Sequence, residues 1–152
     1  MGTNPINSGD TAWVLVSAAL VMLMTPGLAF FYGGMVRRKN ILGVLMQCMI
    51  CLALVSVLWV IFGYALSFGK GNGFLGGLDW FMLNGVGQDA NADYAGTIPH
   101  QAFMIFQGMF AVITPALIIG SFAERMKFSA FVAFTVLWLA FVYSPVCHMV
   151  WA

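Results

Sequence analysis

Residues 11–36 read TAWVLVSAALVMLMTPGLAFFYGGMV, a stretch without one charged side chain that is followed at once by Arg37, Arg38 and Lys39. A bilayer's hydrocarbon core is about 30 Å thick, and roughly 20 residues of α-helix cross it because each residue adds about 1.5 Å along the axis. The uncharged stretch is longer than that. It therefore predicts a membrane-spanning helix that ends at a basic loop.

Three more uncharged runs follow this one, over residues 40–69, 94–123 and 128–152, and a polar connection separates the first two of them. Each run is long enough to span a bilayer. We expect helices over about 11–36, 41–67, 98–123 and 128–151, with a loop over about 68–97 on the outer side. Residues 1–152 then form part of one membrane domain of the all-α integral membrane class, with four transmembrane helices.

Composition excludes several other classes of protein. The chain is 62% hydrophobic and 7% charged, whereas soluble domains carry about 25% charged residues. Its net charge of +1 does not favour nucleic acid as a partner. Cys48 and Cys51 form a C-x-x-C, but they lie inside an apolar run without the partner pair or polar setting of a metal or redox site. We interpret them as packing residues and expect no metal.

The positions of the basic residues predict the topology. Arg37–Lys39 and the pair Arg125 and Lys127 lie in short loops, which are cytoplasmic when they are rich in Lys and Arg. The N-terminus and the long connection then lie outside. Residues 1–10 carry no basic residue, and the following apolar stretch is longer than a signal-peptide core, so we expect the first helix to be retained.

The outer connection is rich in glycine. Residues 71–76, GNGFLG, match the pattern G-x-G-x-x-G. A dinucleotide site also needs a preceding strand and a following helix in a parallel sheet, and neither is plausible between two membrane spans. We therefore interpret these residues as turns.

The third predicted helix carries an aromatic stripe interrupted by an amide. Its members are spaced by four, three and four residues, which places them on one helix face with Phe106 beside them: Phe103, Gln107, Phe110 and Thr114. Such a stripe is compatible with helix packing and with a conduction path. Gln107 lies far from any predicted loop, and polar groups at such depth face protein or a wet cavity.

Four ordered motifs resemble the N-terminal part of the Amt/Mep/Rh ammonium transporter family, with the match closest to microbial Amt proteins. They are FFYGG at 30–34 with RRKN at 37–40, FQGMF at 106–110, AERMKF at 123–128 and HMVW at 148–151. The resemblance implies a multi-pass protein of the cell membrane that transports ammonium or ammonia and is not an enzyme. It implies no cofactor.

The fold implied by the resemblance is an eleven-helix protomer with its N-terminus outside, built from inverted repeats and assembled as a homotrimer. Four helices make up only the N-terminal part of that fold. The pore histidine pair and its capping aspartate in the family would lie beyond Ala152, and His100 and His148 do not occupy those places. PII-type signal proteins are partners implied at the cytoplasmic face, where the loop 37–40 is accessible.

The site implied by the resemblance is an external ammonium recruitment site. Phe110 and Trp151 look like the family's substrate-binding aromatics, and Phe106 and Gln107 look like pore-lining residues. An ammonium ion over an aromatic face gains roughly 0.5 to 2 kcal/mol. We expect the rings of Phe110 and Trp151 to border one externally open cavity.

Two alternatives to transport follow from the same residues. One is a four-helix membrane redox protein, in which His100 and His148 bind a haem from similar depths. The other is a non-transporting remnant of a transporter, since four helices alone do not close a pore.

Overall fold

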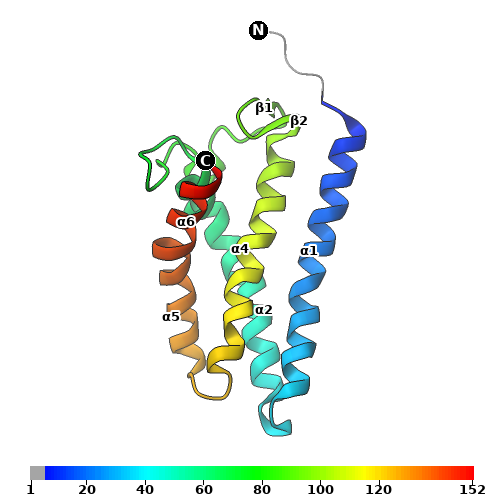
Figure 1. Cartoon of the computed structure of the whole chain (residues 1–152), viewed down its shortest axis with the longest axis vertical. Coiled ribbons are helices and arrows are strands. Elements are labelled where there is room, and N and C mark those ends of the chain that lie inside the picture. The colour runs from blue at the N-terminus through cyan, green and yellow to red at the C-terminus, as the bar shows by residue number, and fades with distance from the viewer. Residues whose placement is uncertain (1–5) are drawn as a thin grey trace.

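The computed structural model describes residues 6–152, and in this range four helical spans are long and apolar enough to cross a membrane. The predicted fold class is therefore confirmed. Figure 1 shows the spans side by side, with the turns after the first and third spans at one end and the outer connection and C-terminus at the other. The part of the signal-peptide prediction that falls on residues 1–5 lies outside the described residues.

Two of the spans are single helices, and two contain a π-helical segment. The first and third spans are α1 (Ser8–Met35) and α4 (His100–Phe122). The second is built of α2 (Ile41–Leu58), η2 (Trp59–Gly63) and α3 (Tyr64–Phe68), and begins after the 3₁₀ turn η1 (Arg38–Asn40). The fourth is built of α5 (Phe128–Trp138), η4 (Leu139–Tyr143) and α6 (Ser144–Trp151).

The first helix begins at Ser8 rather than at the expected residue 11 because Asn7 caps it. The Asn7 side-chain oxygen accepts hydrogen bonds from the backbone N–H of Gly9 at 2.8 Å and of Asp10 at 3.2 Å. Asparagine is among the preferred N-cap residues, since its side chain satisfies N–H groups that have no partner within the helix.

The outer connection contains two strands that the sequence did not predict. Strands β1 (Ala90–Asn91) and β2 (Ala95–Pro99) pair antiparallel, and the 3₁₀ turn η3 (Phe81–Leu83) precedes them. Because β2 extends to Pro99, α4 begins at His100 and not at residue 98. The hairpin lies over the outer end of α4 (Figure 1).

The helices pack around α4, which contacts both α1 and α2. In the half of the bundle near the basic turns, Cys48 and Cys51 are fully buried with Ala116, Ile119 and Phe131. Residues three apart share a helix face, so both thiols point into this apolar cluster. Their place in it agrees with the packing role expected for the C-x-x-C.

On the outer half, the indole of Trp59 fixes the second span against α4. It donates a hydrogen bond from Nε1 to the carbonyl oxygen of Met104 at 3.1 Å. A Cβ atom at Gly108 would lie 2.8 Å from Trp59 Cδ1, and one at Gly63 would lie 2.8 Å from Cε3. Only glycine permits this approach on both sides of the ring, and the resulting contact sets the position of the α4 face that carries Gln107.

Candidate functional site

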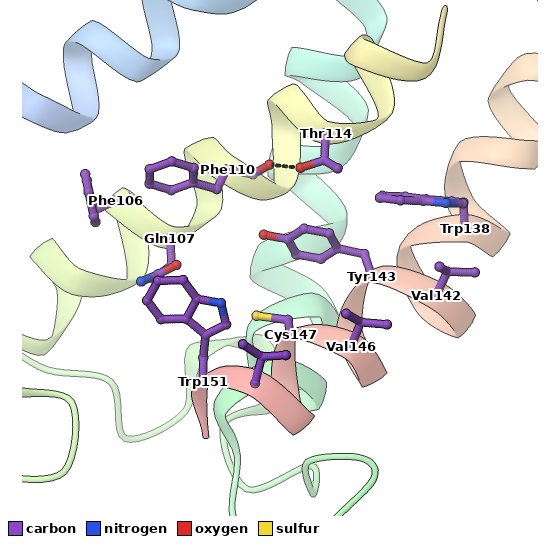
Figure 2. A pocket seen from close by; sticks show the side chains of 11 residues that line it. Phe106, Gln107, Phe110, Thr114, Trp138, Val142, Tyr143, Val146, Cys147 and Trp151 are labelled. Atoms are coloured by element: carbon purple, nitrogen blue, oxygen red, sulfur yellow. Dashed lines mark hydrogen bonds between the residues drawn. The ribbon is translucent and has the colours of Figure 1, made fainter. Parts of the chain in front are cut away.

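A cavity of about 600 Å³ lies between α4 and the fourth span (Figure 2). Its lining is almost entirely apolar and aromatic, with one amide. The residues of α4 are Phe106, Gln107, Phe110 and Thr114, and those of the fourth span are Trp138, Val142, Tyr143, Val146, Cys147, Val150 and Trp151.

The structure brings Phe110 and Trp151 to this one cavity. Phe110 comes from the middle of α4 and Trp151 from the end of α6, and 39% and 63% of their respective surfaces are exposed. In Figure 2 the indole of Trp151 extends from α6 toward Gln107, and the ring of Phe110 lies alongside α4 on the side of Phe106. The phenyl ring of Phe106 meets that of Phe110 edge-on, with centroids 5.1 Å apart.

The depth of the cavity accounts for the different heights of the two rings. Phe110 lies about 15 Å along α4 from its start at His100, at about 1.5 Å per residue, whereas Trp151 ends the fourth span. The cavity reaches from Trp138 to Trp151 along that span, a helical length of roughly 20 Å. It therefore connects the outer end of the bundle with its middle.

Gln107 is the amide of the cavity lining. Its side chain is buried, and its amide forms no hydrogen bond to any side chain or backbone group between residues 6 and 152. Figure 2 places the amide beside the cavity, near the indole of Trp151. Thr114 differs, because its hydroxyl donates to the Phe110 carbonyl oxygen at 2.6 Å.

Phe103, the first member of the aromatic stripe, does not line the cavity. Its ring stacks on Tyr94, with centroids 5.9 Å apart and planes at 13°, and meets Phe68 edge-on at 5.3 Å. The outer connection folds over the start of α4 and covers this position. Phe103 therefore belongs to the outer aromatic core, and the cavity face begins at Phe106.

The fourth span contributes residues to the cavity besides Trp151, and these were not predicted. Tyr143 and Cys147 line the cavity with Trp151, at intervals of four residues. That interval places side chains on one helix face, so it was a usable signal. The π-helical segment η4 ends at Tyr143, the first residue of this face, and nothing in the apolar run marked its position.

The two histidines are held by separate hydrogen bonds. The Nε2 atom of His100 lies 2.5 Å from the Tyr64 hydroxyl. The ring of His148 is bonded at both nitrogens, with Nδ1 3.0 Å from the Ser67 carbonyl oxygen and Nε2 2.9 Å from that of Asn72. Because carbonyl oxygens lie against both nitrogens of His148, neither nitrogen is open to iron, so the haem alternative does not fit. Residues 6–152 contain no cluster of three or more His, Cys, Asp or Glu residues that could hold a metal ion.

At the opposite end of the bundle, Glu124 joins the two basic turns. Its carboxylate accepts hydrogen bonds from Asn40 Nδ2 at 2.7 Å and from the Arg37 backbone N–H at 3.1 Å. The Asn40 hydrogen bond, followed by the Arg37 N–H and the nearby charges of Arg37 and Lys39, holds the pKa of Glu124 below its ordinary value. The carboxylate is therefore charged at neutral pH and ties the turns together.

The fold and the cavity define a multi-pass membrane protein with an aromatic-lined cavity reaching inward from one end of its bundle. Residues 12–152 match the model of the Ammonium Transporter Family, and the chain belongs to that family.

Named relatives and solved structures agree with this assignment. The chain is 56% identical over 143 residues to an ammonium transporter of Bacillus subtilis and 43% identical over 148 residues to ammonium transporter Amt1 of Archaeoglobus fulgidus. These alignments cover 94% and 96% of this chain and 35% of each relative. The crystal structure of Saccharomyces cerevisiae Mep2 superposes with a TM-score of 0.86 at 32% identity, over 99% of this chain and 34% of that one. The chain thus spans about a third of the length of its curated relatives, which are named as transporters.

Proposed function

We propose that the protein to which this chain belongs transports ammonium across the cell membrane, and that this chain contributes the external recruitment site. The observation that carries the proposal is the position of Phe110 and Trp151, which line a single cavity from two different helices. Membership of the Ammonium Transporter Family supports ammonium as the substrate. The remaining helices, expected from the family fold, would complete the pore.

The cavity suits a small cation at its outer part. The faces of Trp151 and Phe110 carry partial negative charge and attract ammonium, and indole is the strongest such face among the natural side chains. The Gln107 side-chain oxygen, which lies on α4 about one turn before Phe110, can accept an N–H bond from the ion. In this scheme Trp151 and Phe110 bind the substrate, and Phe106 and Gln107 line its path.

The apolar lining limits how far a charged ion can travel. Moving a full charge into a dry, low-dielectric space costs several kcal/mol or more when no counter-charge accompanies it. Neutral ammonia avoids this cost once the ion has lost a proton. Potassium has no proton to lose, so the same lining discriminates against a cation of similar size.

The topology and partners of the protein form a second part of the proposal. The basic turns at Arg37–Lys39 and at Arg125 and Lys127 support a cytoplasmic location for that end of the bundle, with the N-terminus and outer connection outside. Family resemblance supports a homotrimer and a PII-type regulatory protein at the cytoplasmic turns. We do not propose an enzymatic reaction.

The experiment that tests the recruitment site is ammonium uptake by the complete transporter, with KM and kcat measured separately. Replacing Trp151 with Leu, or Phe110 with Ala, removes an aromatic face worth roughly 0.5 to 2 kcal/mol. This corresponds to a KM about 2-fold to 30-fold higher. Trp13→Leu is the matched control, because Trp13 is exposed on α1 and does not line the cavity. An unchanged KM in both Trp151→Leu and Phe110→Ala would contradict the proposal.

A further inference from the structure

The cavity between α4 and the fourth span is much larger than an ammonium ion requires. Its volume is about 600 Å³, whereas pockets of roughly 300 to 1,000 Å³ usually hold drug-sized organic molecules. The proposed recruitment site uses only the part of the lining that comes from Phe106, Gln107, Phe110 and Trp151. The remaining lining is apolar and belongs to the fourth span.

A row of valines forms an apolar wall of the cavity. Val142, Val146 and Val150 follow one another at intervals of four residues, so they share a helix face. We call these three residues the valine row. Their side chains are 45%, 50% and 71% exposed, so residues 6–152 leave them largely uncovered. Valine has one strongly preferred rotamer in a helix, and the wall is therefore in place before a ligand arrives.

Aromatic rings continue this wall towards the middle of the bundle. Trp138 lies four residues before Val142 and lines the same cavity. Its ring tilts against that of Tyr143, with centroids 5.7 Å apart and planes at 41°. Tyr143 in turn meets Trp59 edge-on at 6.1 Å. The apolar part of the cavity therefore combines an aliphatic wall with an aromatic end that is packed against the second span.

The cation-binding end of the cavity lies next to the valine row. Val150 directly precedes Trp151 in α6, and Val146 lies about 7.5 Å of helix before it. Gln107, whose amide lies near the Trp151 indole in Figure 2, makes no side-chain hydrogen bond within residues 6–152. Its amide oxygen is an acceptor for an N–H group. A cation bound at this end therefore has an apolar surface beside it.

A ligand that matches both parts of the cavity carries an ammonium head on a short, unbranched hydrocarbon chain. n-Butylammonium has the structure of a lysine side chain. Lysine in proteins lays its methylene groups on apolar surface while its charged end stays at a polar one. The ammonium head suits the aromatic faces and the Gln107 oxygen, and the chain suits the valine row.

From this arrangement we propose that the valine row is an apolar subsite, and that the cavity binds primary alkylammonium ions as competitors of ammonium. The head occupies the proposed recruitment site, and the alkyl chain lies along the valine row. The position of the head rests on the proposed recruitment function. The subsite for the chain rests on the volume and lining of the cavity.

The apolar subsite makes affinity depend on chain length. Complete burial of one methylene group raises affinity about fourfold, and a wall that covers the chain incompletely gives less. We expect a gain of about twofold to fourfold for each methylene. Three methylenes separate methylammonium from n-butylammonium, so the inhibition constant should fall about 8-fold to 60-fold between them.

The first test measures the inhibition of ammonium uptake by the complete transporter with methyl-, ethyl-, n-propyl- and n-butylammonium. We expect competitive inhibition with constants that fall along the series. n-Butanol carries the same chain without the charge and controls for partition into the bilayer; it should inhibit about tenfold more weakly than n-butylammonium. Inhibition constants that do not change with chain length, or equal inhibition by n-butanol, would overturn the proposal.

The second test places a hydroxyl group in the subsite. Val146→Thr keeps the branched shape of the side chain but adds a polar group that is costly to cover with hydrocarbon. The ratio of the methylammonium and n-butylammonium inhibition constants should fall about threefold or more. The matched control is Val57→Thr, because Val57 is exposed on α2 and does not line the cavity. A ratio in Val146→Thr equal to that of the control would overturn the subsite.

The same ratio separates the subsite from the recruitment site, because it compares two ligands on one variant. Trp151→Leu should weaken both amines alike and keep the ratio. A normal KM for ammonium in Trp151→Leu with the ratio intact would refute the recruitment site and keep the subsite. A raised KM in that variant, with no chain-length dependence in the parent protein, would refute the subsite alone.

A third readout needs no transport. Magnetisation transfer from the terminal methyl group of n-butylammonium to the labelled valines of the purified transporter should reach Val146, with the signal assigned by its loss in Val146→Thr. Val57 should receive none, since it lies outside the cavity. Absence of transfer to Val146 at saturating n-butylammonium would overturn the proposal.

Discussion

Replacing Gly108 with Ala should disrupt the contact that holds the second span against α4. A methyl group at this position would lie 2.8 Å from Trp59 Cδ1 and 3.0 Å from Nε1, well inside van der Waals contact. The indole cannot swing away on its far side, because Gly63 meets that edge of the ring closely. Trp59 must therefore shift as a whole, and its hydrogen bond to the Met104 carbonyl at 3.1 Å is lost.

The expected change in stability has two contributions, the overpacking around Trp59 and the lost hydrogen bond to Met104. Overpacking a well-packed interior costs about 1 to 3 kcal/mol, and loss of one hydrogen bond adds about 1 kcal/mol. We expect Gly108→Ala to lower the free energy of unfolding by about 2 to 4 kcal/mol. Titration of the purified protein from mild detergent into dodecyl sulfate, followed by circular dichroism, measures this change.

Gly43→Ala is the matched control for this variant. Gly43 lies in α2, and a Cβ atom there would have no neighbour within 4 Å. Its substitution should leave stability unchanged or slightly higher, because Ala favours helix over Gly by about 1 kcal/mol. If Gly108→Ala were as stable as Gly43→Ala, the Trp59 contact would not be the restraint that we infer.

Two further predictions concern the ends of the bundle. Arg38→Cys should react with a membrane-impermeant maleimide only after the cells are permeabilised. Phe74→Cys, at an exposed position in the glycine-rich part of the outer connection, should react in intact cells. The reverse pattern would show that the basic turns lie outside the cell. The contact of Glu124 with the Arg37 backbone should be complete at neutral pH and should weaken only as the pH falls through the depressed pKa of Glu124. This direction follows because a carboxyl whose pKa is lower in the folded protein stabilises the fold above its unfolded pKa and loses that contribution on protonation. Hydrogen exchange at the Arg37 amide measures this contact. Exchange should be slow in the parent protein at neutral pH and fast at all pH values in Glu124→Ala. Slow exchange in that variant would show that the carboxylate does not hold the turn.

The membrane spans could be predicted from charge alone because the bilayer excludes charged side chains over a known thickness. The ends of the runs at Val36 and Ala123 were predicted from the charged residues that follow them. The first residues of the helices were harder to predict from the sequence, because they depend on hydrogen bonds and on neighbouring structure. Asn7 extends α1 towards the N-terminus, and the strand that ends at Pro99 delays the start of α4.

The sequence predicted only some of the residues that line the candidate site. Phe106, Gln107 and Phe110 follow from helical spacing, and Trp151 from its motif. Phe103 shared the same spacing but is covered by Tyr94 from the outer connection, a tertiary contact that periodicity does not encode. The two bonds of His148 likewise depend on a turn that lies far from it in the chain.

The most direct test of the account is whether ammonium occupies the cavity between Phe110 and Trp151. Magnetisation transfer from ¹⁵N-ammonium to the labelled aromatic rings of the complete transporter reports this contact without transport. We predict transfer to the rings of Trp151 and Phe110, none to the exposed ring of Trp13, and loss of the Phe110 signal in Trp151→Leu. Transfer that reaches neither cavity ring at saturating ammonium would contradict the proposed recruitment site.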